Sequence, residues 1–325
     1  MILKEYNIGW GVDWLMKQLE QQIVNARLSK YYTDDSRTVI INSVWYTKDY
    51  HQQVIAELRN LHPTHIFVVA MLDPPIIDLK WFDEFNCNVQ GIGYYPGNGY
   101  VDYFAIFADK FFQPVDQALL DASKIDRAYM CLNRKPHPHR LRLYQGLESA
   151  GILDQGIVSM GGSPPIRLLD NDVDIQQLVH DVDVQQLAPN GGIDQFGIGN
   201  DITSLGNIGY WQRHFVNIVT ETIWDIDSCN FLSEKTFKPI LGLRPFLIYA
   251  PDGGFMCLTR RGFEPYVDDF KDISDVDLRH PYNIPVFLTE LCKQGPDYWK
   301  MKLVDLKEKL LYNQQQFKEH VRKQS

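Results

Sequence analysis

The sequence lacks the features that mark several common classes of protein. It has no run of about 18 consecutive apolar residues, so we expect no segment that spans a membrane. Its first residues, MILKEYNIGWG, lack the apolar core of a signal peptide, and we therefore expect a soluble, cytoplasmic protein. The 5 cysteines are scattered and form no CxxC pair, which argues against a zinc ribbon or a disulfide framework.

Positive charge is also scarce. The 325 residues include 32 Lys and Arg against 41 Asp and Glu, which gives a net charge of −9. Binding to a phosphate backbone needs a clustered cationic face, so this balance argues against a general nucleic-acid binder. The GxxxxGK[ST], GxGxxG and GxSxG patterns are absent, which removes P-loop ATPases, a dinucleotide fingerprint and a hydrolase elbow.

What is present is a repeated pattern of short apolar runs and amphipathic stretches. A hydrophobic content of 45% is ample for sizeable cores. The alternation predicts βαβ units, mostly parallel sheets and an α/β fold. The strands are expected at residues 38–46, 65–72, 89–95, 126–133, 156–160, 214–221 and 244–250.

The pattern restarts after residue 118, which suggests two α/β halves. We predict an N-terminal domain over residues 1–118 and a second domain over residues 119–297. Residues 298–325 are expected to form one long helix, because apolar side chains from Trp299 to Val321 recur at helical spacing. This helix could pack back on the N-terminal domain.

A basic turn follows the strand predicted at residues 126–133. Residues 127–147 hold five Lys or Arg and no acid, and three of these cations, Arg134, Lys135 and Arg140, lie between the strand end and the start of a helix. A turn from strand to helix presents backbone N–H groups and the positive end of the helix dipole at the sheet edge. The segment therefore predicts an anion site, most simply for a diphosphate; the alternative is a solvated basic turn.

A second polar group follows the strand predicted at residues 214–221. This strand ends at Glu221, and Ser233, Glu234 and Lys235 then open a helix, with Ser233 as a good N-cap. A carboxylate at that position can bind sugar hydroxyls, and a lysine can neutralise phosphate as a point charge. The alternative is a plain capped helix in which Glu234 serves only the helix dipole.

Residues 231–266, FLSEKTFKPILGLRPFLIYAPDGGFMCLTRRGFEPY, resemble the donor-binding half of GT-B glycosyltransferases, closest to the fucosyltransferase-like group and its phage and bacterial relatives. The turn NRKPHPHR is similar to the phosphate-binding loop of that group. The resemblance implies two Rossmann-like domains that face a cleft. It also implies that Arg134 or Arg140 contacts the diphosphate of a GDP- or UDP-linked sugar, with Glu234 on the ribose, Lys235 on the phosphate and Glu221 at the sugar pocket. Ser233 stands where the group usually has Thr.

An inverting transfer to a hydroxyl acceptor, such as a glycan, also needs a general base, which we expect in the N-terminal half. Asp13 and Asp73 are the candidates because each lies near an expected strand end, and Glu84 is a weaker third. Asp13 and Asp73 could equally be helix-cap or turn residues.

Neither a metal nor another cofactor is expected besides the nucleotide sugar. Two rival hypotheses remain open. One is a non-catalytic glycan- or nucleotide-binding module of the same fold. The other is a metal-dependent transferase that uses a DxD pair such as Asp225 and Asp227.

Overall fold

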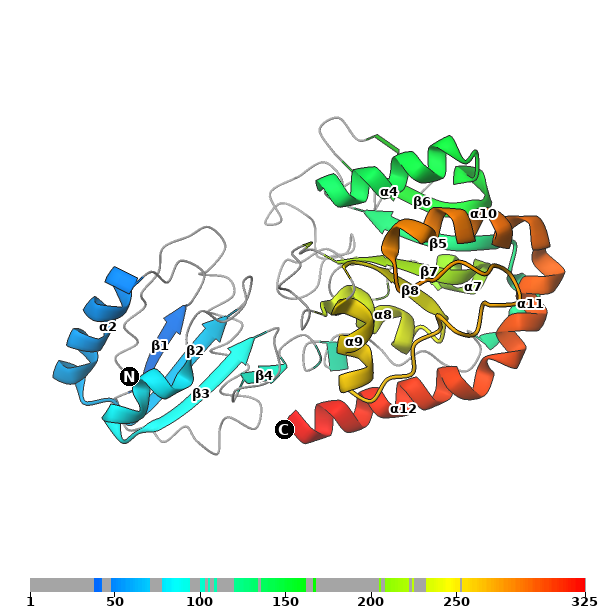
Figure 1. The fold of residues 1–325 in the computed structure, drawn as a ribbon. Coiled ribbons are helices and arrows are strands. Elements are labelled where there is room, and N and C mark those ends of the chain that lie inside the picture. Colours follow the sequence, from blue (N-terminus) through cyan, green and yellow to red (C-terminus); the bar gives the residue numbers. More distant parts are fainter. Residues whose placement is uncertain are drawn as a thin grey trace. The chain divides into compact units, whose positions relative to one another are not determined.

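The computed structural model shows a mixed α/β protein (Figure 1). The chain divides into two compact units, Met1–Phe104 with Lys323–Ser325 and Ala105–Arg322. The domain boundaries predicted at residues 118 and 297 stay predictions. The structure describes residues 38–42, 48–70, 78–93, 100–102, 105, 108–109, 120–133, 136–161, 166–167, 205, 208–221, 224, 232–251 and 253–324.

The first unit contains a parallel sheet with the order β1-β2-β3-β4, which is also the order along the chain. The side chains of Val54 and Leu58 on its helix pack with Ile66 and Val68 of the sheet to form a buried core. The elements are β1 (Thr38–Asn42), α2 (Lys48–Leu61), β2 (His65–Ala70), η2 (Leu79–Phe85), β3 (Asn88–Gly93) and β4 (Tyr100–Asp102).

The second unit contains a second four-stranded parallel sheet, in the order β6-β5-β7-β8. Every residue of β6 and β7 is buried, as expected for parallel strands that are covered on both faces. The strands are β5 (Arg127–Asn133), β6 (Gly156–Met160), β7 (His214–Thr220) and β8 (Phe246–Tyr249).

Helices cover this second sheet and extend beyond it. Helix α4 lies against α10, while α8 packs on α12 through the rings of Phe237 and Phe317, whose centroids are 5.5 Å apart. The helical elements are η4 (Ala122–Lys124), α4 (Pro138–Ser149), η5 (Leu153–Gln155), α7 (Ile208–Arg213), α8 (Glu234–Leu241), α9 (Gly253–Arg260), η8 (Pro281–Asn283), α10 (Ile284–Gln294), α11 (Pro296–Asp305) and α12 (Lys307–Gln324).

The expectation of one helix over residues 298–325 is wrong in one respect. The apolar stripe from Trp299 to Val321 is buried as predicted, but α11 ends at Asp305, with Leu306 as its C-cap at a ψ of −1°, and α12 begins at Lys307. The two halves cover different elements. The indole of Trp299 in α11 donates to the Leu291 carbonyl of α10, whereas α12 packs on α8, so the chain turns between them.

Candidate functional site

The strand order of the second unit reverses between β5 and β7. The chain passes from β5 outward to β6, returns across β5 to β7, and then continues outward to β8. Right-handed connections place α4 and α8 on opposite faces of the sheet when the two steps run in opposite directions. The two helices therefore begin at the carboxyl ends of neighbouring strands and diverge from there. Ligands of open α/β sheets bind at such a point.

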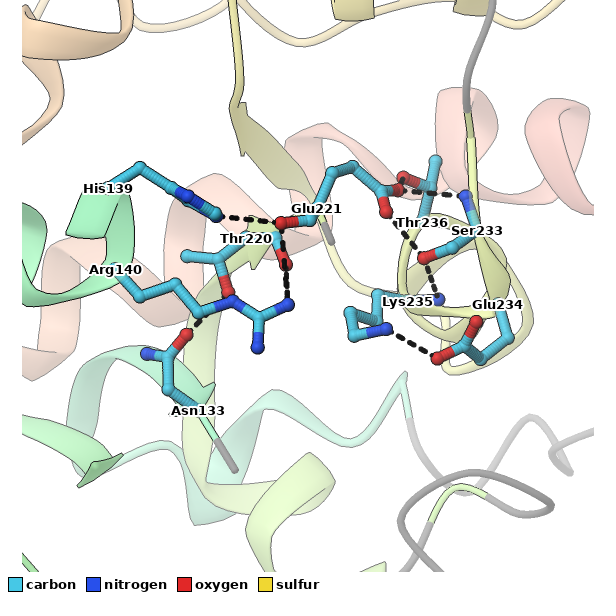
Figure 2. A network of polar contacts seen from close by, with 9 residues as sticks. All are labelled: Asn133, His139, Arg140, Thr220, Glu221, Ser233, Glu234, Lys235 and Thr236. Carbon is cyan, nitrogen blue, oxygen red and sulfur yellow. Dashed lines mark hydrogen bonds and ion pairs between the residues drawn. The ribbon is translucent and has the colours of Figure 1, made fainter. Parts of the chain in front are cut away.

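The end of β7 is tied to the start of α8 by the carboxylate of Glu221 (Figure 2). One oxygen, Oε1, accepts from the Ser233 backbone N–H at 3.0 Å and from the Thr236 hydroxyl at 2.5 Å. The other oxygen accepts from the Ser233 hydroxyl at 2.5 Å. All three residues are buried. Glu221 thus fixes where α8 begins, because the first backbone N–H groups of a helix have no partner inside it.

Ser233 is the N-cap of α8, as the sequence predicts. Its Oγ accepts from the backbone N–H of Lys235 at 3.2 Å, and its φ and ψ are those of extended chain. The same hydroxyl donates to Glu221, so one side chain serves both the helix start and the strand end. This arrangement explains why a short helix of eight residues begins at a defined position.

Glu234 and Lys235 form an ion pair in the first turn of α8. The Lys235 Nζ lies 2.6 Å from the Glu234 Oε1, and the carboxylate side chain is 7% exposed while the lysine side chain is 31% exposed. Burial by itself would raise the pKa of Glu234, but the charge and hydrogen bond of Lys235, helped by Lys238, outweigh burial and lower that pKa. Glu234 is therefore an ionised carboxylate at the sheet edge.

The first turn of α4 contacts the end of β7 from the other face of the sheet. Arg140 is buried, and its Nη2 donates to the carbonyl oxygens of Thr220 at 3.2 Å and Glu221 at 3.3 Å. The Thr220 hydroxyl donates to the Asn133 side chain, at the end of β5, at 2.5 Å. These bonds join the ends of β5 and β7 and hold a guanidinium charge beside them (Figure 2).

His139 makes the third contact of α4 with this edge. Its Nε2 lies 2.9 Å from the Glu221 carbonyl oxygen, which can only accept, so this nitrogen carries the proton. Burial, opposed by the hydrogen bond to Glu221 and helped by the charge of Arg140, lowers the pKa of His139 to about 4. The imidazole is therefore neutral at pH 7 and adds no charge to the site.

The edge combines features that suit an anionic, hydroxyl-bearing ligand. Two helices, α4 and α8, direct their N-termini to it, and helix N-termini bind anions. Arg140 and Lys235 supply full positive charges, and Glu234 supplies an ionised acceptor for hydroxyl groups. A sugar phosphate presents both kinds of partner.

The structure brings five of the predicted site residues into one region of the second sheet. These are Arg140, Glu221, Ser233, Glu234 and Lys235. The other four, Asp13, Asp73, Arg134 and Lys135, lie outside the described residues, and so does the Asp225–Asp227 pair. Glu84 forms an exposed ion pair with Arg59 at 3.0 Å.

The sequence interpretation missed four members of the network: Asn133, His139, Thr220 and Thr236. Asn133 and Thr220 end neighbouring strands, where polar residues interrupt apolar runs, and that interruption is a usable signal. Thr236 follows the N-cap Ser233 by three residues, which places it on the same side of the first helical turn.

No protein-family model, curated protein or solved structure was found to match the chain. Among the described residues, no three His, Cys, Asp or Glu side chains are grouped in a way that could hold a metal ion. None of the helices formed by these residues is long and apolar enough to cross a membrane.

Proposed function

We propose that this chain is a GT-B glycosyltransferase that moves a sugar from a nucleotide-diphosphate donor, GDP- or UDP-linked, to a hydroxyl acceptor. The observation that carries the proposal is the reversal of strand order between β5 and β7, with a polar network at its carboxyl edge. The donor lies at this edge, in the C-terminal half of the chain. Transfer is inverting and needs no metal ion.

The roles follow from the charges at the edge. Arg140 supplies positive charge for the diphosphate, as Arg134 and Lys135 of the basic turn are expected to do, and Lys235 neutralises a phosphate from the opposite helix. Glu234 accepts hydrogen bonds from the ribose hydroxyls, which suits its lowered pKa. Glu221 acts as a positioning residue, since its carboxylate is engaged by Ser233 and Thr236.

The reaction needs one proton transfer and one charge stabilisation. A base, Asp13 or Asp73, takes the proton of the acceptor hydroxyl while its oxygen forms a bond to the anomeric carbon. The bond from that carbon to the phosphate oxygen breaks, and the nucleoside diphosphate leaves with the electron pair. The cations at the edge stabilise the developing negative charge.

Calorimetry with GDP and UDP tests the donor site. Lys235→Ala and Arg134→Ala should each weaken the binding of the preferred nucleotide about 10- to 100-fold, because each removes a charge-assisted hydrogen bond. Lys293→Ala is the matched control: this lysine has the same charge but pairs with Glu290 on the exposed face of α10. Binding should be the same with and without EDTA. The proposal fails if the wild-type chain binds neither nucleotide at millimolar concentration.

Turnover separates a transferase from its rivals. Either Asp13→Asn or Asp73→Asn should abolish most sugar transfer and leave nucleotide affinity within about twofold, since the base contacts only the acceptor. A chain that binds a nucleotide sugar tightly but transfers nothing would instead be a binding module. Activity lost in EDTA and restored by manganese would point to a metal-dependent transferase.

A further inference from the structure

Three rings at the carboxyl edge of the second sheet lie in nearly parallel planes. The His137 and His139 rings, at the start of α4, have centroids 5.9 Å apart and planes within 4° of each other. The Trp224 ring, three residues beyond Glu221, is 5.1 Å from His139 at an interplanar angle of 15°. The three rings therefore form a stack with His139, the residue before Arg140 in the chain, at its centre.

Two tyrosines pack at an angle to this stack: the planes of Tyr249 and Tyr282 are inclined by 33° and 60° to that of Trp224. The Tyr249 ring, at the end of β8, lies 4.9 Å from Trp224, and the Tyr282 ring lies 6.0 Å from Trp224. Tyr282 accepts a hydrogen bond from Arg142 at 3.0 Å, and the guanidinium carbon of Arg142 lies 5.6 Å from the centroid of its ring. We call His137, His139, Trp224, Tyr249 and Tyr282 the ring cluster.

Tyr282 is exposed to solvent although several side chains hold its ring in place. It is 56% exposed, yet Arg142, Trp224 and Tyr249 all contact it. Its position is therefore fixed before any ligand arrives, which lowers the entropy cost of stacking a ligand ring on it. An exposed aromatic ring that is held in place has the form of a binding surface.

We propose that the ring cluster stacks the nucleobase of the donor. This inference rests on the proposed function, because the phosphates at Arg140 place the rest of the nucleotide beside α4. Tyr282 supplies the exposed flat face, held at an angle to Trp224 and Tyr249, and a flat face suits a flat base better than a puckered pyranose. Aromatic stacking tolerates any base, so the cluster supports the binding of GDP and UDP alike. The neutral state of His139, whose pKa is about 4, keeps a positive charge out of the stack.

The test compares ligands with and without a base. The dissociation constants of GDP, UDP and inorganic pyrophosphate are measured for the wild type, Tyr282→Leu, Trp224→Leu and Trp224→Phe. The two leucine variants should bind the nucleotides about tenfold more weakly and pyrophosphate equally well, since only the stacking partner is lost. Trp224→Phe should keep most of the nucleotide affinity. Tyr312→Leu, at a ring on α12 that is 41% exposed, is the control and should change nothing.

Each contrary result has its own meaning. If wild-type protein binds neither nucleotide, the proposed function and the base site are both overturned. If nucleotides bind but Tyr282→Leu keeps full affinity, the donor site stands and the base site is overturned. If a leucine variant weakens pyrophosphate as much as GDP, the rings only support the fold. If it weakens only the nucleotide sugar and not the nucleotide, the cluster holds the sugar.

Discussion

The two sheets of this protein are built from the same parts and differ in the order of their strands. Each has four parallel strands, but the first follows the chain as β1-β2-β3-β4 and the second runs β6-β5-β7-β8. In the first unit, each step between described strands goes in the same direction, so right-handed connections stay on one face. In the second unit the direction reverses between β5 and β7, so α4 and α8 lie on opposite faces of the sheet. The polar network lies at the carboxyl ends of β5 and β7, where these two helices begin. The connection order, more than the strand content, defines the candidate site.

The two sheets also differ in how well they are covered. All seven residues of β7 are buried, whereas in β3 Asn88 is exposed and Val89 and Gln90 are half-buried. A covered sheet edge has a lower local dielectric, which strengthens hydrogen bonds and raises the cost of leaving a polar group unpaired. Changes at the edge of β5 and β7 should therefore have larger effects than changes at exposed polar residues.

The largest effect is expected at Glu221. Glu221→Ala removes the acceptor of three hydrogen bonds and leaves the buried donors of Ser233 and Thr236 unpaired. Because each unpaired buried donor costs about 1–3 kcal/mol, the free energy of unfolding should fall by roughly 3 kcal/mol or more. Urea-induced unfolding measures it.

Glu221→Gln sharpens the comparison. Its amide oxygen accepts from one or two of the same donors, so this variant should recover part of the loss. A Glu221→Ala protein as stable as the wild type would show that α8 does not depend on the hydrogen bonds to Glu221. Changes at the sheet edge would then have no larger effect on stability than changes at exposed polar residues.

The next effect concerns pH and the buried histidines of the second unit. Burial, with the nearby charge of Arg244, lowers the pKa of His214 to about 3, and burial lowers that of His139 to about 4. Below the unfolded pKa of about 6.5, the unfolded chain takes up protons that the folded chain does not. Stability should therefore fall as pH drops from 6.5 toward 4, by about 1.4 kcal/mol per pH unit for each histidine.

His214→Asn should reduce this slope by about half. The Nδ1 of His214 lies 2.7 Å from the Tyr210 carbonyl oxygen, and an asparagine amide can donate to the same oxygen but does not titrate. Urea unfolding at pH 7, 6, 5 and 4 gives the slope of each protein. Equal slopes in the variant and the wild type would mean that His214 is protonated in the folded chain.

Most of the architecture could be predicted from local patterns. The apolar runs at residues 38–46, 65–72 and 126–133 are confirmed as strands at Thr38–Asn42, His65–Ala70 and Arg127–Asn133, while residues 43–46 and 71–72 lie outside the described residues. The strand β4 has three residues and gives too short a pattern to recognise. The turn at Leu306 was missed because it depends on which elements α11 and α12 pack against. The apolar spacing from Trp299 to Val321 is the same whether the helix is continuous or turns.

The candidate site was predictable only in part, for a related reason. Ser233 signals a helix start by its residue type and position, and this start places Lys235 in the first turn of the helix. The bond between Thr220 and Asn133 joins residues that are 87 positions apart, and it exists only because β5 and β7 are neighbours. Strand order is not encoded in any local pattern, so the network and the ring cluster required the fold.

The smallest effect is expected at the opposite end of the same two strands. Asp126 precedes β5 and Arg213 precedes β7, and they form a two-pronged ion pair with a shortest contact of 2.7 Å. Both side chains are more than 40% exposed, so water and salt weaken the pair. Asp126→Asn should lower the free energy of unfolding by less than about 1 kcal/mol, and by still less in 1 M salt. It should leave GDP and UDP affinity unchanged, because a ligand at the carboxyl edge lies a full strand length away. A loss of nucleotide affinity in this variant would instead place the nucleotide at the amino ends of β5 and β7, where Asp126 and Arg213 lie.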